Sequence, residues 1–267
     1  MDVDGFWDLV ERSAEETRDK GERVKWLKEH LSGLSAEEIV DYHTWFTIHR
    51  NRACTWDMYA VCYYVAGFGS SDGFEYFVDW LISLGREAFE KVVDCPDRIV
   101  ELPEVQRLIE LARAFVHRRI STSGDIWLGR FTQTRLHTLL EEEYPQYELF
   151  AYVTFDPYRQ VTGEDTEHLG DAVRARGVDS KFPFVTYYVE CDGEPWDWSD
   201  REEFARRLPR LASHYEFIED LDERSRRYAT WWPERTFWRE RIRAWVFHRE
   251  GTTITWRDIS RLRYVPG

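Results

Sequence analysis

Apolar residues recur at helical spacing through the first 120 residues of the chain. Positions three and four apart fall on one face of an α-helix, so this spacing predicts a series of amphipathic helices. Ser35 and Glu38 form the S-x-x-E pattern of a capping box, which predicts the start of one of them. The residues that carry the spacing are Phe6, Leu9, Val10, Val24, Leu27, Leu31, Ile39, Tyr42, Trp45, Phe46, His49, Leu108, Leu111, Ala112 and Phe115.

The pattern changes after the stretch STSGD at residues 121–125, which has the composition of a linker. Residues 147–155, 182–191 and 242–256 are rich in β-branched and aromatic residues and predict strands. A second S-x-x-E pattern, from Ser199 to Glu202, predicts a helix between them. We therefore expect an α+β protein. Its mostly helical N-terminal domain would span residues 1–120, and a C-terminal domain with an antiparallel sheet and helices would span residues 126–267.

The stretch GSSDG at residues 69–73 fits the G-x-S-x-G pattern of a hydrolase nucleophile elbow. An elbow needs a strand before the serine, but residues 56–66 are long for a strand and begin like a helix. We therefore predict two helices joined by this turn, with Gly85 ending the second. Asp72 is predicted to cap that helix and Ser71 is not expected to be a nucleophile. Arg86 could reach back to Asp57 or Asp72.

The same region resembles the bacterial family called domain of unknown function 4240, over about the first 120 residues. The family loop usually reads closer to G-G-C-S-D-D-x-F, so Gly69 and Ser71 stand here where a Cys and an acid would be. This difference also counts against a nucleophilic Ser71. The resemblance implies a mostly helical fold and no particular activity. The features that carry it are Trp56-Asp57, the loop from Gly67 to Phe74, Phe77, Trp80-Leu81-Ile82, Gly85-Arg86, Phe89 and Pro96-Asp97.

Composition limits the possible functions. The net charge of −14 disfavours binding to nucleic acid or to an anionic membrane, and no apolar run is long enough to span a bilayer. The acidic, amphipathic N-terminus is unlike a signal peptide, so we expect a cytoplasmic protein. The four cysteines form no C-x-x-C pair, and no nucleotide-binding motif is present. We therefore expect buried thiols, no structural metal and no cofactor.

Histidines supply few strong signals of chemistry. His137 and Glu141 lie four apart on a predicted helix, where they could hold a metal ion but more readily form a surface ion pair. His168 follows Asp165 in a polar segment that could be an acidic lid, and His214 belongs to no complete motif. His49, on an apolar stripe, is expected to be a hydrogen-bonded core residue.

Aromatic residues make up 16% of the chain, and their density in the C-terminal part suggests binding. Trp196, Asp197 and Trp198 fall in a turn, where paired indoles and a carboxylate could clamp a peptide, a sugar or a cation. Packing in the core is the expectation for most of the other tryptophans. We expect a binding or interaction protein that holds a peptide, a protein or a small molecule near the domain junction. Trp56 and Trp80 would contribute from the N-terminal side.

The alternative is an enzyme that modifies a peptide or a small metabolite by acid–base chemistry at the same junction. Its candidate groups are Asp57, Asp72 and Arg86 from the first domain and His168 or His214 from the second. An enzyme requires several of these groups around one pocket with shifted pKa values, whereas a binding protein requires exposed aromatic residues without such a cluster.

Overall fold

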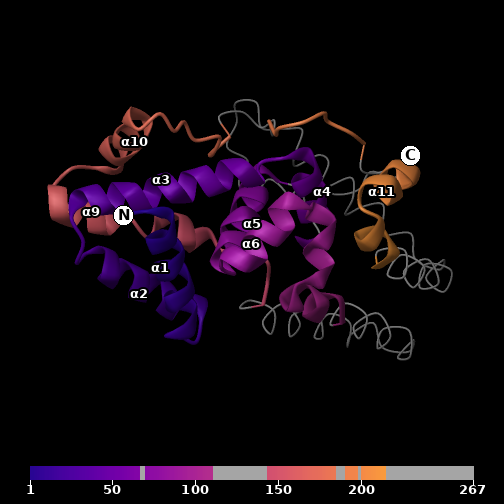
Figure 1. Cartoon of the computed structure of the whole chain (residues 1–267), viewed down its shortest axis with the longest axis horizontal. Helices are drawn as coiled ribbons and strands as arrows, with labels where there is room; N and C mark the ends of the chain where they lie inside the picture. Colours follow the sequence, from indigo (N-terminus) through magenta and orange to yellow (C-terminus); the bar gives the residue numbers. More distant parts are fainter. Residues whose placement is uncertain (67–69, 111–142, 185–189, 198–199, 215–267) are drawn as a thin grey trace, which may run out of the picture. The chain divides into compact units, whose positions relative to one another are not determined.

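Helices build the part of the chain that the structure describes (Figure 1). The structure is a computed structural model and describes residues 1–66, 70–110, 143–184, 190–197 and 200–214. All of these residues belong to one compact unit, Met1–Asp220. Of the described residues, 73% are helical and they form no sheet. None of the described helices has the length and apolar character needed to cross a membrane.

The N-terminal helices follow one another with short connections. In chain order they are α1 (Val3–Glu15), α2 (Lys20–Leu31), α3 (Ala36–Ala53), α4 (Trp56–Ala66), α5 (Ser71–Ser83), α6 (Arg86–Asp94) and the 3₁₀ helix η1 (Pro96–Glu101). After the undescribed residues 111–142 come the 3₁₀ helix η2 (Glu148–Tyr152), α9 (Phe155–Thr162), α10 (Thr166–Ala175) and α11 (Arg201–Arg207).

Helix α3 packs against neighbours on several sides. It contacts α1 and α5 and also α9 and α10, which lie beside its first half in Figure 1. The predicted capping box is confirmed, because the Ser35 hydroxyl accepts from the Glu38 N–H while the Glu38 carboxylate accepts from the Ser35 N–H. Tyr42 and Phe46 enter the main core, and Ile39 enters a smaller core with α9 and α10.

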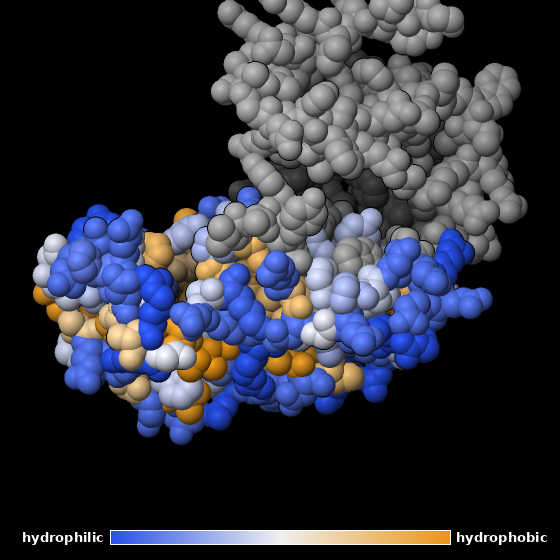
Figure 2. All heavy atoms as spheres, turned by 90° about the horizontal axis from the view of Figure 1, so that it is seen from above, coloured by the Kyte–Doolittle hydropathy of each residue, from blue (hydrophilic) through white to orange (hydrophobic). Residues whose placement is uncertain are grey.

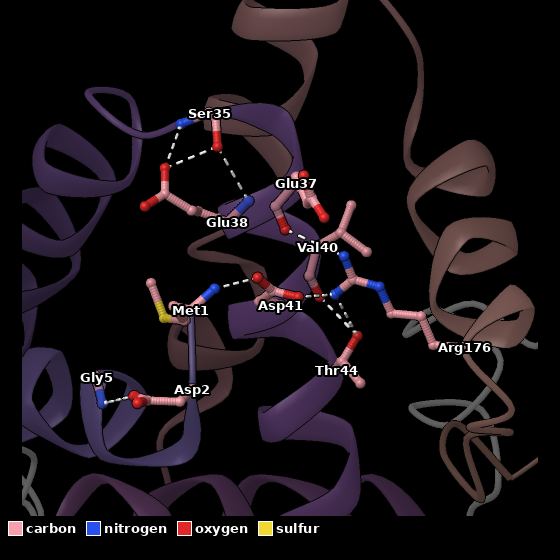
Figure 3. A network of polar contacts seen from close by, with 10 residues as sticks. All are labelled: Met1, Asp2, Gly5, Ser35, Glu37, Glu38, Val40, Asp41, Thr44 and Arg176. Carbon is pink, nitrogen blue, oxygen red and sulfur yellow. Dashed lines mark hydrogen bonds and ion pairs between the residues drawn. The ribbon is translucent and has the colours of Figure 1, made fainter.

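Polar contacts join the end of α10 to α3 (Figure 3). The carboxylate of Asp41 contacts both the amino group of Met1 and the guanidinium of Arg176. Arg176 also donates to the backbone carbonyl of Glu37, 3.3 Å away, and to the Thr44 hydroxyl at 3.4 Å. Residues that are distant in the sequence therefore converge on one face of α3.

The predicted α+β class is wrong for the residues that the structure describes. The segment 147–155 forms η2 and the start of α9 instead of a strand. Its buried hydrophobic residues are Tyr147, Phe150 and Val153, and Thr154 is buried as well, whereas Leu149 is 56% exposed. The buried hydrophobic residues recur at every third position, which suits a 3₁₀ helix with three residues per turn and not a strand with a period of two.

The other predicted strands have different outcomes. In the segment 182–191, neither 182–184 nor 190–191 is a strand, and 185–189 lie outside the described residues. Among the described residues, β-pairing takes the form of an isolated parallel bridge between Thr55 and Asp192. Residues 242–256 lie outside the described part of the chain, so nothing in the structure bears on that prediction.

The predicted linker, residues 121–125, also lies outside the described residues, and the domain boundary stays a prediction. Residues from beyond it share a core with the N-terminal helices. Tyr147, Phe150 and Phe204 belong to the same buried cluster as Phe6 and Phe74. The helices of the N-terminal region and the segments around residues 147–212 are therefore packed together within the described unit.

Candidate functional site

The turn at GSSDG joins two helices, as predicted from the sequence. The segment before it is α4 and not a strand, so the geometry of a nucleophile elbow is missing. The N-cap of α5 is Ser70, whose hydroxyl accepts from the Gly73 N–H at 3.0 Å. The prediction that Asp72 is the cap is wrong, because α5 begins at Ser71 and Asp72 lies within its first turn. Ser71 donates a hydrogen bond to the Asp72 carboxylate.

Arg86 points away from both of its predicted partners. Its guanidinium lies 2.7 Å from the Asp4 carboxylate, and its backbone N–H donates to Glu11. Gly85 follows the end of α5, as predicted, and is the N-cap of α6, whose Phe89 packs against Trp7 of α1. Gly85 has φ of +96°, and an added Cβ would lie 3.3 Å from the Glu11 side chain, so glycine suits this position.

Asp57 and Trp196, two of the predicted site residues, meet through Arg207. The guanidinium of Arg207 lies 5.2 Å from the centre of the Trp196 ring and donates to the Asp57 carboxylate at 3.3 Å. It also donates to Glu203 at 2.7 Å. Hydrogen bonds from Arg206 and then from Arg207 lower the pKa of the Glu203 carboxyl to about 2. A guanidinium is thus held between an indole and two carboxylates.

Contacts with α4 place this group on the N-terminal helices. Tyr64 of α4 stacks on Phe204 of α11 with ring centres 4.1 Å apart. Trp56, at the start of α4, donates its backbone N–H to the carbonyl of Asp192, 3.3 Å away. The indole of Trp56 is half-buried and packs against the main core. The segment 190–197 and α11 are therefore both docked on α4.

Acidic residues flank Trp196 in the sequence of the segment 190–197. Trp196 itself is half-buried, and the carboxylate-bearing residues of this segment, Glu190, Asp192, Glu194 and Asp197, are all exposed. Lys181 pairs with Asp192 at 2.5 Å. We use the name Trp196 surface for Asp57, Glu194, Trp196, Asp197 and Arg207. Trp198, also predicted to bind ligand, lies outside the described residues.

The remaining predicted site residues lie elsewhere. Trp80 is a core residue with 3% exposure, and its ring packs 5.4 Å from that of Phe77. His168 is exposed on α10, where its Nδ1 lies 2.8 Å from the Asp165 carboxylate, and this hydrogen bond raises the pKa of His168. The polar segment considered as a lid includes the beginning of α10, and Asp165 is the N-cap of that helix. His214 is half-buried at the end of the described residues.

A buried charge cluster was missed by the sequence reasoning. The Nε of Arg50 on α3 lies 2.7 Å from an Asp79 carboxylate oxygen on α5, as an ion pair. Its Nη2 donates to the other Asp79 oxygen at 3.5 Å and to Glu75 at 3.3 Å. The Phe182 ring lies 4.5 Å from the guanidinium carbon, and the Phe184 N–H donates to Glu75 at 3.3 Å. Burial raises the pKa of Glu75, and it raises that of Asp79 to about 7 against the opposing effect of Arg50.

This cluster had a signal in the sequence. Glu75 and Asp79 lie four residues apart, beside the apolar stripe of Phe74, Phe77, Val78, Leu81 and Ile82, and two carboxylates that become buried next to such a stripe require a cation. Asp79 is fully buried, so the cluster holds α3 and α5 together and offers no surface to a substrate.

His49 occupies the core, as predicted, but lacks the hydrogen bond that was expected for it. Its ring packs among Phe6, Trp7, Trp45 and Phe89. Neither ring nitrogen has a hydrogen-bond partner within the described part of the chain. Burial lowers the pKa of His49 to about 4, so the imidazole is neutral at pH 7.

The expectation that the protein holds no structural metal stays a prediction. The described residues contain no group of three or more His, Cys, Asp and Glu side chains placed to hold a metal ion. His137 and Glu141, the pair considered for such a site, lie outside the described residues.

Hydrophilic residues cover much of the described face in Figure 2, with hydrophobic residues showing between them. The exposed large hydrophobic residues are Tyr63, Leu149, Tyr152 and Val161. Two of them, Leu149 and Tyr152, lie on η2, and Tyr63 lies on α4.

Comparison with known proteins gives one match. The sequence model of a family described as "Protein of unknown function (DUF4240)" matches residues 1–160. This match confirms the resemblance seen in the sequence and extends it from residue 120 through η2 into α9. It includes Asp57 and the buried charge cluster, whereas Trp196 and Arg207 lie outside it. Neither a curated protein nor a solved structure matches the chain.

Proposed function

The chain belongs to the DUF4240 family, and we propose that it is a binding protein that holds a cationic segment of a peptide or partner protein at the Trp196 surface. The matched region supplies Asp57 through α4, and the segment after it supplies Trp196 and Arg207. The ligand-binding part of the site would therefore be completed by residues outside the family match.

One observation carries this proposal, namely the position of Arg207. Its guanidinium already lies over the Trp196 ring and against the Asp57 and Glu203 carboxylates. An indole beside carboxylates is an environment that favours a guanidinium or ammonium group through cation–π and charge-assisted hydrogen bonds. A cation from a partner would meet the same chemistry at Glu194 and Asp197, which are exposed beside Trp196.

The charge of the protein supports a cationic partner. A net charge of −14 attracts positively charged molecules at long range and raises their association rate at low ionic strength. The exposed acids at Glu190, Asp192, Glu194 and Asp197 concentrate part of this charge next to Trp196. Binding of this kind weakens as salt is added, because exposed charges are screened over about 10 Å at 0.1 M salt.

The contacts of the candidate catalytic residues give less support to the alternative of acid–base catalysis. Hydrogen bonds and ion pairs of four candidate residues go to four different partners: Asp57 to Arg207, Asp72 to Ser71, Arg86 to Asp4 and His168 to Asp165. Asp79, whose pKa burial raises to about 7, is fully buried. These contacts do not join the candidates around one reacting group.

A peptide titration tests the proposal. Fluorescein-labelled hexaarginine and hexalysine would be titrated with the full chain by fluorescence anisotropy, with hexaglutamate as the reference. We expect the two cationic peptides to bind and Trp196→Ala to weaken that binding by about tenfold or more, which corresponds to about 1.4 kcal/mol. The double variant Glu194→Gln/Asp197→Asn should weaken it as well.

A matched control separates a site from general attraction to an acidic protein. Glu29 on α2 and Glu87 on α6 carry exposed carboxylates, as Glu194 and Asp197 do. Each of these two glutamates pairs with a lysine on its own helix. The double variant Glu29→Gln/Glu87→Gln removes the same charge and should bind hexaarginine like the wild type. Equal weakening by both double variants, with no effect of Trp196→Ala, would contradict the proposal.

A further inference from the structure

Cys54 and Cys191 lie against each other although they are 137 residues apart in the chain. Their Sγ atoms are 3.7 Å apart, within hydrogen-bonding distance for sulfur. Cys54 follows the last residue of α3 and is buried, whereas Cys191 is partly exposed in the segment 190–197. Both are thiols in the structure, and neither Cys62 nor Cys95 shares such a contact in the described part of the chain.

Backbone hydrogen bonds hold the two thiols in register. The Asp192 N–H donates to the Cys54 carbonyl at 2.9 Å, and the Trp56 N–H donates to the Asp192 carbonyl at 3.3 Å. These bonds form the parallel bridge between Thr55 and Asp192, so Cys54 and Cys191 stand opposite each other one position earlier. Neighbouring strands lie about 4.8 Å apart, and disulfides span Cα separations of roughly 4.4–6.8 Å.

We propose that Cys54 and Cys191 are a modification site, where a small disulfide such as oxidised glutathione converts the two thiols to a reversible intramolecular disulfide. The two sulfurs need to approach from 3.7 Å to about 2.0 Å, which side-chain rotation can supply because the backbone register is already set. This property goes beyond the proposed binding function and is measured without any peptide.

The exchange takes place in two balanced steps. The thiolate of the partly exposed Cys191 attacks one sulfur of the small disulfide, so a mixed disulfide forms and one small thiolate leaves with the proton of Cys191. The thiolate of Cys54 then attacks the Cys191 sulfur, and the second small thiolate leaves with the proton of Cys54. Two protein thiols are oxidised, one small disulfide is reduced to two thiols, and excess small thiol reverses both steps.

A nearby positive charge favours the attack of Cys54 in the second step. In the reduced pair the hydrogen bond between the two thiols lowers the pKa of Cys54 and raises that of Cys191. That hydrogen bond is lost once Cys191 carries the small thiol, whereas the positive charge of Lys181 still lowers the pKa of Cys54. A lower pKa increases the thiolate fraction, which is the form that attacks a disulfide. Because Cys54 is buried, the reagent reaches Cys191 first and Cys54 acts as the resolving thiol.

The bond would fix the segment 190–197 to the junction of α3 and α4. The non-covalent bridge at Thr55 and Asp192 holds that segment in the reduced protein, and the disulfide would replace it with a covalent link. Because the linked residues are far apart in the sequence, the cross-link also restricts the unfolded chain. Oxidation is therefore expected to raise the melting temperature.

Mass spectrometry of the full chain tests the proposal. The reduced protein would be equilibrated with glutathione buffers of increasing oxidised fraction, and remaining thiols would be trapped with N-ethylmaleimide. Trypsin places Cys54 in the peptide 53–86 and Cys191 in the peptide 182–201. We expect these two peptides to become linked, with fragment ions that place the bond on Cys54 and not on Cys62, and excess reduced glutathione to release them.

Two variants act as controls. Cys95→Ala removes the exposed cysteine and should leave the linked peptides and the rise in melting temperature unchanged. Cys191→Ala should abolish both and leave Cys54 open to trapping only after unfolding. Cys191 carrying glutathione while Cys54 stays a thiol, at a large excess of oxidised glutathione, would overturn the proposal. A bond from Cys54 to Cys62 or Cys95 would overturn it equally.

Discussion

Arg50 and Asp79 form a buried ion pair in which the guanidinium Nε lies 2.7 Å from a carboxylate oxygen of a fully buried side chain. Arg50 belongs to α3 and Asp79 to α5, so the pair joins two helices within the region that matches the family. Glu75 adds a second carboxylate to the same cation. Breaking a buried pair by removing one partner costs far more than breaking an exposed pair, because a charge is left in the interior.

Arg50→Leu should therefore lower the free energy of unfolding by about 3–5 kcal/mol, because it leaves Glu75 and Asp79 without their cation. Arg52→Leu is the matched control on the same helix. Its partners are Glu90 and the exposed Asp94, the Arg52 and Glu90 side chains are about one-third exposed, and we expect a loss of about 1 kcal/mol or less. Urea denaturation of both variants at pH 7 makes the comparison. Similar losses from the two variants would show that the buried cluster is not a stabilising contact.

Asp79 should make stability depend on pH near neutrality. An aspartate in an unfolded chain titrates near pH 4, whereas burial raises the pKa of Asp79 to about 7 in the folded protein. Between these values the folded state binds the extra proton, so this group makes the protein less stable as the pH rises and has no further effect above the folded pKa.

Asp79→Asn should remove this dependence. The difference in unfolding free energy between wild type and variant should change by up to about 1.4 kcal/mol per pH unit across that window. Glu75, whose pKa is also raised by burial, interacts with Asp79 and therefore contributes to the same difference. Parallel curves of stability against pH for the two proteins would be inconsistent with a raised pKa at Asp79.

His49 should act in the opposite direction. Burial lowers the pKa of His49 from 6.5 to about 4. Between these two pH values the unfolded chain binds a proton at His49 that the folded chain does not bind. Its contribution to stability is present above pH 6.5 and is lost as the pH falls through that window. His49→Phe keeps an aromatic ring among Phe6, Trp7 and Phe89 and should resist acid unfolding better. Circular dichroism during acid titration gives the midpoints, and an unchanged midpoint would count against this role.

Ser70 should be the costly position in the GSSDG turn. Its hydroxyl accepts from the Gly73 N–H, and loss of such a cap typically costs about 1 kcal/mol. Ser70→Ala should therefore lower the melting temperature, Asp72→Asn should lower it less, and Ser71→Ala should leave it close to wild type. A fluorophosphonate probe should not label Ser71. The opposite order of Ser70 and Asp72, or labelling of Ser71, would show that this assignment of the cap is mistaken.

Local signals in the sequence predicted the local structure well. The capping box at Ser35, the two helices on either side of GSSDG and the break at Gly85 all depend on residues within a few positions of one another. The cap at Ser70 was missed by two positions, because Ser70 and Asp72 are both good capping residues and only the length of the turn decides between them.

Longer-range features could not be read from the pattern. In residues 147–155 the aromatic content suggested a strand, but the buried hydrophobic residues recur at every third position. The partners Arg50 and Asp79 are 29 residues apart, and Asp57 and Arg207 are 150 apart, so no spacing rule joins them. Asp57 and Trp196 were both predicted as site residues, and the residue that brings them together, Arg207, carried no signal of its own.

The central claim is that Trp196 contacts a cationic ligand, and the side-chain indole N–H signals of the tryptophans measure this most directly. In a ¹⁵N–¹H spectrum the Trp196 signal would be assigned from Trp196→Phe and followed while hexaarginine is added. We expect this signal to shift in proportion to binding, while those of Trp7 and Trp80, which are buried in the core, stay in place. A Trp196 signal that does not move at saturating peptide, or shifts confined to other tryptophans, would contradict the claim.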